Sequence, residues 1–455
     1  MGGGEGVAER ILVSFAGEGS GAGELSWGQQ VVWRGIHARG APIILTGIQP
    51  LPDGSTVQDV ADDLRYLMSR HPSLRTRLLL DVGGDGHMQQ VLASSGETYL
   101  EVIDTGDDAD PHETARAVEA EYEFADRDYA NDWPLRVAVI RHRGAPVYRV
   151  MAMDHLTSDG FGVLSMLEDL AARDRVTDAA PPVTSTEALE QARWQHTPAG
   201  ERQTRRAEQH WERLLRTIPA RRFPEKRDGR TPRHWQATFT SPASYLAIQV
   251  IAARTQMDTS PVLVAAFAVG LARATGVNPV VPRLYVNNRF RPGFADTVSP
   301  VAQTCPCVLD VAGITFDQAV THAWRATVAA CKSAYFAPAR IRKLIEDVGQ
   351  ERGEEIDLAL VYNDRRMDTP REVAKSLPGP EEIRAALPLT TLDWEKSDDP
   401  LDECHFHVQD SPDAVNMLAV TDTQYISPAD TEGILREMET AAVAAALDPA
   451  ASTGV

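Results

Sequence analysis

Residues 153–162 read Met153-Asp154-His155-Leu156-Thr157-Ser158-Asp159-Gly160-Phe161-Gly162, and this stretch decides the predicted fold. The residues before it, 146–153, mix Val, Tyr and Met in the manner of a buried strand. From Phe161 to Leu170, apolar residues recur at the spacing of a helix. The sequence therefore predicts a strand, a short loop that carries His155, and a helix.

This loop has the composition of an acyl-transfer site. A neutral imidazole at His155 can take a proton from an amine or alcohol while that nucleophile attacks a thioester or ester carbonyl. We expect Asp159 to hold the loop by pairing with a buried arginine, and Gly160 to admit a backbone geometry or a close ligand approach that a side chain would block. A single histidine before a helix is more often structural, so the assignment depends on the rest of the chain.

Further motifs have the order and approximate spacing seen around this histidine pattern in one superfamily. They are S-x-x-Q-x-x-x-W at 26–33, R-H-P-S-L-R-T-R-L at 70–78, W-P-L-R-V at 133–137, H-W-E-R-L-L at 210–215, the apolar run 262–276, the segment 298–310 and Y-I-S-P at 425–428. Over essentially its full length, the chain resembles a condensation domain of nonribosomal peptide synthetases, within the chloramphenicol acetyltransferase-like acyltransferases.

The resemblance implies an α/β (α+β) fold of two chloramphenicol acetyltransferase-like lobes in a V-shaped pseudodimer. Each lobe is expected to be a mixed sheet packed with helices, with the active site between the lobes. We expect the lobes at residues 1–178 and 179–455, with a linker over 175–190 and one helix over 194–215. The implied donor is an acyl or aminoacyl thioester on the phosphopantetheine of an acyl or peptidyl carrier protein, and no cofactor of its own is implied.

The resemblance also assigns residue roles. His155, Asp159 and Gly160 match the catalytic motif, and Arg75 lies in a stretch that resembles the family's R-H-x-x-L-R-T, from which a salt bridge to Asp159 is expected. The family usually has two adjacent histidines, and the first of them is Asp154 here. Asp154 either supports the loop, as we favour because adjacent strand side chains face opposite ways, or tunes the pKa of His155 by its charge.

Composition narrows the possible partners. The net charge of −20 over 455 residues argues against nucleic acid, which clustered Lys and Arg would bind. We expect no membrane partner and a cytoplasmic location, because no apolar run has the length of a membrane span and the Gly-rich start lacks the features of a secretory signal. The four cysteines, at 305, 307, 331 and 404, are expected to be reduced thiols.

One segment departs from the acidic balance. Residues 202–233 are rich in arginine, and within them Arg205, Arg206, Arg213 and Arg216 are candidates for docking an acidic carrier protein or its phosphopantetheine phosphate. The alternative is a solvated helix face followed by a connector.

Metal binding is a second alternative for the histidine loop. Asp154, His155 and Asp159 have ligand types that suit divalent ions, but their spacing does not distinguish a metal site. The run Cys404-His405-Phe406-His407 could offer ligands to zinc, yet strand alternation places the two histidines on one face and Cys404 on the other.

Several positions depart from the family pattern. Gln303 stands where the family has asparagine, Val308 stands at its arginine position, and the later motifs of chain-elongating domains are not recognisable. We therefore expect a free-standing condensation enzyme of natural-product biosynthesis that forms an amide or ester with a small amine or alcohol acceptor. The rivals are a transferase that uses acyl-CoA and a catalytically silent member that docks carrier proteins.

Overall fold

The computed structural model describes residues 9–79, 88–177, 179–224, 228–367, 376–396 and 403–455. The chain divides into two compact units, residues 1–202 with 287–302 and residues 203–286 with 303–455. This boundary differs from the expected one at 178/179, because helix α5 (Ala188–Gln195) is bonded into the first unit. There the side chain of Gln195 accepts a hydrogen bond from Trp27 N at 3.0 Å, and Gln191 donates one to Ser299 at 2.7 Å.

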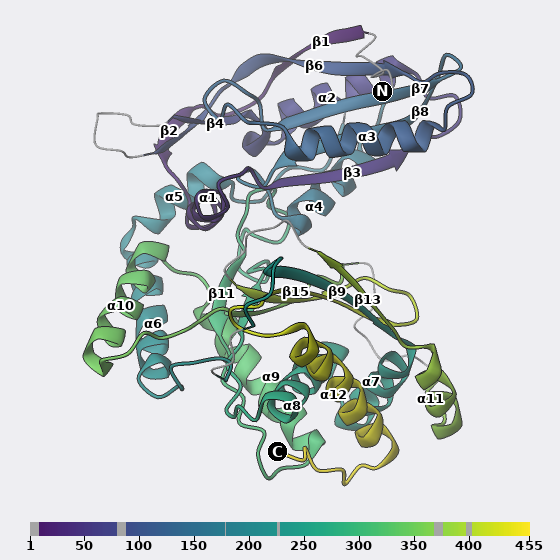
Figure 1. The fold of residues 1–455 in the computed structure, drawn as a ribbon. Helices are drawn as coiled ribbons and strands as arrows, with labels where there is room; N and C mark the ends of the chain where they lie inside the picture. Colours follow the sequence, from purple (N-terminus) through teal and green to yellow (C-terminus); the bar gives the residue numbers. More distant parts are fainter. Residues whose placement is uncertain (1–8, 80–87, 178, 225–227, 368–375, 397–402) are drawn as a thin grey trace. The chain divides into compact units, whose positions relative to one another are not determined.

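The first unit is built on a five-stranded mixed sheet with the order β1-β6-β7-β8-β3, beside a small sheet β2-β5-β4 (Figure 1). Among the described strands of the larger sheet, β6 and β7 run parallel and the other neighbours are antiparallel. Its further elements are β1 (Glu9–Ala16), β2 (Gly21–Glu24), α1 (Trp27–Arg39), β3 (Ile44–Pro50), α2 (Val57–Arg70), η1 (Pro72–Arg75), β4 (Thr76–Leu79), β5 (Gln89–Leu92), β6 (Ser95–Asp104), α3 (Pro111–Phe124), β7 (Leu135–His142), β8 (Ala145–Asp154) and α4 (Gly160–Ala172).

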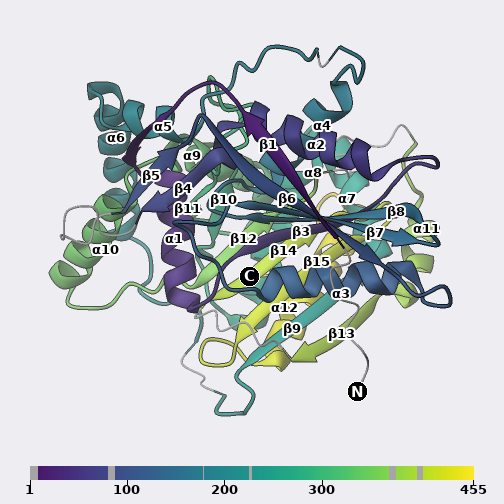
Figure 2. The same cartoon turned by 90° about the horizontal axis from the view of Figure 1, so that it is seen from above.

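Helices cover both faces of this sheet. Met151 and Met153 of β8 lie in one core cluster with residues of α2 and α4. Val150 and Ala152, which alternate with them, lie in a second cluster with α3, and Figure 2 shows α3 along the sheet from above. Strand alternation therefore gives Asp154 the α3 side of the sheet and the next residue, His155, the α4 side.

The second unit contains a seven-stranded mixed sheet with the order β11-β10-β12-β14-β15-β9-β13. Helix α6 (Pro198–Leu215) begins at the end of the first unit and continues into the second. The other elements are β9 (His234–Ser241), α7 (Pro242–Thr255), α8 (Thr259–Thr275), β10 (Arg283–Val286), β11 (Gln303–Pro306), α9 (Phe316–Ser333), α10 (Pro338–Arg352), β12 (Leu360–Asp364), α11 (Pro380–Ala386), η2 (Leu387–Leu389), β13 (Thr391–Lys396), β14 (Cys404–Gln409), β15 (Val415–Asp422) and α12 (Pro428–Leu447).

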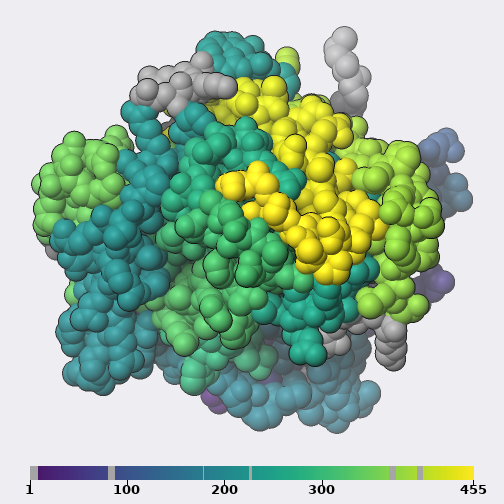
Figure 3. Space-filling view, turned by 90° about the horizontal axis from the view of Figure 1, so that it is seen from below, coloured from purple at the N-terminus to yellow at the C-terminus, as the bar shows by residue number. Residues whose placement is uncertain are grey.

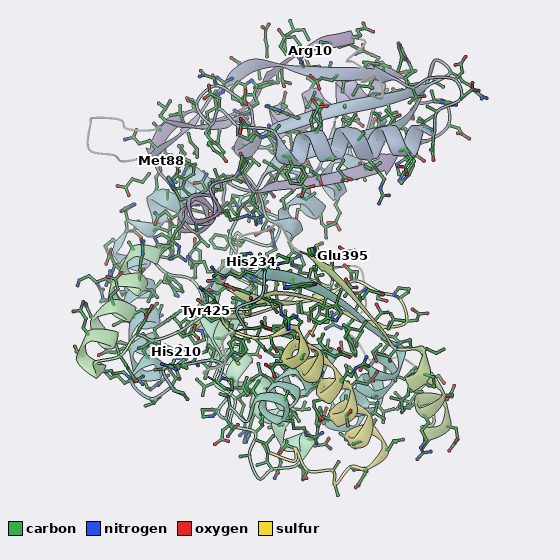
Figure 4. All side chains as sticks on the ribbon, in the orientation of Figure 1. Arg10, Met88, His210, His234, Glu395 and Tyr425 are labelled. Atoms are coloured by element: carbon green, nitrogen blue, oxygen red, sulfur yellow. The ribbon has the colours of Figure 1, made fainter. Side chains whose placement is uncertain are left out.

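Apolar helices cover one face of the second sheet. The ring of Phe406 on β14 lies 4.9 Å from that of Phe267 on α8, and α12 packs on the same core, where Figure 3 shows its surface in yellow. His405 and His407 alternate with Phe406 and lie on the opposite face, with their rings 5.4 Å apart. Figure 4 marks β9 and β13 of the same sheet with His234 and Glu395.

The structure revises one local expectation and explains one departure from the family pattern. The single helix expected over 194–215 is wrong, because the chain breaks at Thr197 and restarts with Pro198 as the first residue of α6. Gln303, which replaces an expected asparagine, uses both ends of its amide on Phe336, accepting from its N–H at 2.9 Å and donating to its carbonyl at 3.0 Å.

No single described helix combines the length and the apolar character needed to cross a membrane. Helices α7 and α8 pass such a test only as a pair, and the pair is bent by 115°.

Candidate active site

The histidine loop begins where β8 ends. The N–H of His155 donates to the carbonyl of Ile43 at 2.9 Å, which continues the pairing with β3 by one residue. The N–H of Thr157 then donates to the carbonyl of Asp154 at 2.9 Å and turns the chain toward α4. His155 is half-buried between fully buried neighbours. Its backbone is therefore fixed by the sheet, while its side chain remains partly accessible.

Asp154 lies on the face of the sheet opposite to His155 and supports the loop from that side. Its side chain is 3% exposed, and Oδ1 accepts a hydrogen bond from Leu156 N at 3.0 Å. Burial raises the pKa of this carboxyl to about 6, although the Leu156 hydrogen bond and the charge of Arg127 oppose the rise. This geometry supports the favoured role of Asp154 in the loop, and the role itself stays a prediction.

Asp159 connects the loop to helix α4 and to a distant segment of the chain. As the N-cap of α4, its Oδ1 accepts from Gly162 N at 2.9 Å. The same oxygen lies 2.6 Å from the guanidinium of Arg289, with both side chains at most 10% exposed. Its Oδ2 accepts from Val301 N at 3.2 Å. Asp159 thus fixes both the loop and residues 287–302, which return to the first unit.

The expected salt bridge from Arg75 to Asp159 is wrong. Arg75 is fully buried, and its guanidinium donates to the backbone carbonyls of Ala93 and Glu18, the latter at 2.8 Å. A hypothetical side chain at Gly17 would collide with it. The structure therefore places Arg75 beneath the turn between β1 and β2, where it satisfies carbonyl groups rather than a carboxylate.

Arg75→Met tests the structural role of the Arg75 side chain. The substitution keeps most of the buried volume but leaves two carbonyls without donors, so the free energy of unfolding should fall by about 2–3 kcal/mol. Urea denaturation measures this loss, and Arg116→Met on the exposed face of α3 is the control, with a change within about 0.5 kcal/mol. Turnover per folded molecule should stay unchanged. If Arg75→Met lost turnover but kept its full stability, Arg75 would have a role in the active site.

Two glycines allow the segment 287–302 to approach the loop. A Cβ on Gly162 would lie 2.7 Å from the carbonyl oxygen of Val298 and 3.1 Å from the guanidinium of Arg289. A Cβ on Gly28 of α1 would lie 1.9 Å from the carbonyl oxygen of Pro300. Gly160, in contrast, is the first residue of α4 and is not among the glycines with positive φ. Its expected role therefore reduces to close approach of a ligand and remains a prediction.

Sequence reasoning missed Arg289 and Gly162. Arg289 follows Asn288 in a run with a second arginine, Arg291, and nothing in the spacing marks which of them reaches residue 159 across 130 positions. Gly162 is within the quoted motif, but its need for a missing side chain follows only from the carbonyl of Val298 beside it.

The four arginines named as docking candidates are exposed, three of them on α6 and Arg216 directly after its last residue, and they differ in their partners. Arg216 lies 2.8 Å from both Glu212 and Glu351. Arg213 donates to the ring of His210, which Figure 4 labels on α6, at 2.9 Å. Neighbouring α10 is joined to α6 by the pair of Arg340 and Glu208. Residues 225–227 of the basic segment lie outside the described residues.

Among the described residues, no ligand cluster is found at either of the metal sites considered as alternatives. Within the part of the chain that the structure describes, no group of three or more His, Cys, Asp or Glu side chains is arranged to hold an ion. Cys404 lies in the helix-covered core, whereas His405 pairs with Glu403 at 3.0 Å on the other face of the sheet.

Comparison with known proteins agrees with this architecture. A family model named condensation domain matches residues 51–377. No curated protein sequence matches the chain. The first condensation domain of the calcium-dependent antibiotic synthetase is 17% identical with a TM-score of 0.70, and the match covers 96% of this chain and 99% of that one.

Two further structures are similar. The SgcC5 protein from Streptomyces globisporus is 17% identical with a TM-score of 0.69, covering 94% of this chain and 100% of that one. A condensation domain that mediates chain release from the enacyloxin polyketide synthase is 19% identical with a TM-score of 0.67, covering 94% and 83%. At these identities the matches concern the fold, and they confirm the expected fold class.

Proposed function

Because the chain belongs to the condensation-domain family, we propose that it is an acyltransferase that joins a carrier-bound acyl or aminoacyl thioester to an amine or alcohol. The observation that carries this proposal is the fixed histidine loop. His155 continues the β3–β8 pairing, and Asp159, four residues later, is bonded to Arg289 and Val301. A half-buried imidazole held in this way can accept a proton from the acceptor nucleophile or orient it.

The start of α4 can assist by binding negative charge. The N–H groups of Gly162 and Val163 are taken by Asp159, as the side-chain cap and the first helical bond respectively. The N–H groups of Gly160 and Phe161 come before them in the first turn, where helices leave backbone donors available. We assign these two donors to the oxyanion that forms when the acceptor attacks the thioester carbonyl.

Both amines and alcohols are retained as acceptors. The SgcC5 protein was solved with an aryl-substituted 1,2-ethanediol, which supports testing alcohols. The proposed enzyme and an acyl-CoA-dependent transferase differ in what carries the acyl group. Acyl-CoA has the same phosphopantetheine arm as the carrier protein but lacks the protein itself.

Intact-mass analysis tests the donor and the acceptor together. Acyl-loaded carrier protein and the matching acyl-CoA are each incubated with the enzyme and a panel of amines and alcohols. The proposal expects acceptor-dependent loss of the acyl mass from the carrier, with slower use of acyl-CoA. Faster use of acyl-CoA favours the rival enzyme, and unchanged carrier mass with every acceptor favours the silent docking member.

The arginines of α6 give a further prediction. Charge reversal at Arg205, Arg206 and Arg213 is expected to lower the rate with carrier-bound donor by about 3- to 10-fold, most strongly at low salt, because it weakens encounter with an acidic partner. Arg216→Glu is the matched control with a smaller loss, since two glutamates already balance Arg216. Small thioester mimics should react equally with all variants. Unchanged carrier-dependent rates would make this surface a solvated helix face.

A further inference from the structure

A small polar pocket lies behind the histidine loop, on the side of Asp154. It has about 20 Å³ of free volume, which is room for about one water molecule, and its lining includes Arg127, Tyr129 and Asp154. Arg127 and Tyr129 come from the connection between α3 and β7, which is anchored where Leu78 N donates to the carbonyl of Tyr129 at 2.9 Å. The pocket therefore joins a third segment of the first unit to the loop.

Polar groups in this pocket are buried without a direct partner among the residues that the structure describes. Within the described residues, none of the three guanidinium nitrogens of Arg127 and neither lone pair of the Tyr129 hydroxyl is in a hydrogen bond, and all four atoms are buried. Burial without hydrogen bonds is costly for a cation. Within the described residues the Arg127 guanidinium makes no direct hydrogen bond, and its charge lowers the pKa of Asp154.

Other charged groups near the pocket are already engaged. Asp132 lies 3.1 Å from Arg136, and Asp128 accepts from Ala130 N at 3.1 Å. The residues of α1, η1 and β4 that line the pocket are uncharged, namely Gln29, Ser73, Thr76 and Leu78. The charges of Asp154 and Asp132 both act on Arg127, and of these two it is Asp154 that is buried and that has no ion pair with another arginine among the described residues.

We propose that Arg127 is a positioning residue, whose charge, placed in the same pocket as Asp154, keeps Asp154 ionised and so holds the histidine loop in its active form. An ionised carboxylate accepts the Leu156 N–H bond about twice as strongly as a neutral group. The bond fixes the residue that follows His155. The proposal rests on the proposed function for its effect on turnover, but its effect on Asp154 does not.

The pH dependence has a defined sign. The folded pKa of Asp154 is about 6, above its ordinary value, so its contribution to stability is present at low pH and is lost as pH rises through 6. Removing the charge of Arg127 raises this pKa further, because a favourable neighbour of the carboxylate is lost. The acid limb of turnover and the pH-dependent part of stability must then both move to higher pH.

Four variants test the proposal: Arg127→Met, Arg127→Lys, Asp154→Asn and the double variant R127M/D154N. Unfolding in urea and turnover are each measured from pH 5 to 8. Arg127→Met is expected to shift the acid limb of turnover and the titration seen in stability upward by about one pH unit or more, with Arg127→Lys close to the parent. In the Asp154→Asn background, Arg127→Met should produce no shift, since no carboxylate remains to titrate.

An unshifted stability titration in folded Arg127→Met overturns the proposal without reference to any substrate. A shift of equal size in the Asp154→Asn background also overturns it, because Arg127 would then act on another group. If Arg127→Met does not fold, the proposal requires the double variant to fold, since no lone buried carboxylate remains, and failure of both overturns it. A shifted stability titration in a protein without acyl transfer would support the proposal and contradict the proposed function.

Discussion

His155→Ala is expected to lower turnover by about two to four orders of magnitude, the usual loss for a positioned acid-base group. The fold should persist, because the hydrogen bond from residue 155 to Ile43 uses the backbone and the imidazole is only half-buried. The measurement is turnover of a small thioester with excess acceptor, which avoids carrier docking, alongside urea denaturation of the same preparation.

His196→Ala supplies the matched control. His196 is an exposed histidine of the same unit, 3.0 Å from Glu24, and its loss should leave turnover unchanged. A second variant, His155→Gln, retains a hydrogen-bonding side chain of similar reach without a basic imidazole. Recovery of most activity in His155→Gln indicates orientation of the nucleophile, whereas its absence indicates proton transfer. Near-parental turnover in His155→Ala would remove His155 from the chemistry.

Asp159→Ala is expected to lower the free energy of unfolding by about 3–5 kcal/mol, because it leaves Arg289 as a buried charge without its carboxylate. The same change removes the N-cap of α4, which is worth about 1 kcal/mol and overlaps with that loss. Turnover should fall as well, since residues 287–302 lose their bond to the loop at Val301. Urea denaturation and turnover per folded molecule measure the two effects.

Arg289→Met and the double variant D159A/R289M complete a cycle. The double variant should lose clearly less stability than the two single losses added together, because it leaves neither charge buried alone. The exposed pair of Arg65 and Asp62 is the control, and Arg65→Ala should cost less than about 1 kcal/mol. A fully stable but inactive Asp159→Ala protein would contradict the structural assignment and give the carboxylate a direct role in the reaction.

Local sequence patterns identified elements whose start and end have distinct chemistry. The strand expected over 146–153 is β8, and the helix expected over 161–170 is α4, which begins after the Asp159 cap. The strand alternation expected over 404–407 is found in β14. Long-range pairing was not accessible in this way. The return of residues 287–302 to the first unit depends on contacts at Gly28 and Gly162 that no local pattern encodes.

The same distinction between local patterns and long-range contacts applies to the candidate site. His155, Asp154 and Asp159 were identified because they lie together in one loop, where strand and helix periodicity fix their order. Their partners come from elsewhere: Arg289 lies 130 residues later, and Arg127 lies in an irregular connection. The family-like motif around Arg75 predicts a bond to Asp159, but a buried arginine can be satisfied as well by carbonyls as by a carboxylate.

Single-turnover acyl transfer tests the central claim most directly. Acyl-loaded carrier protein is mixed with excess enzyme, with and without an amine or alcohol acceptor, and the mass of the carrier and of the product is followed over time. The account predicts that the parent enzyme moves the acyl group to the acceptor, with no comparable loss when the acceptor is absent, and that His155→Ala slows this step by about 100-fold or more. Loss of the acyl group that is equally fast without acceptor, or equally fast in His155→Ala, would contradict it.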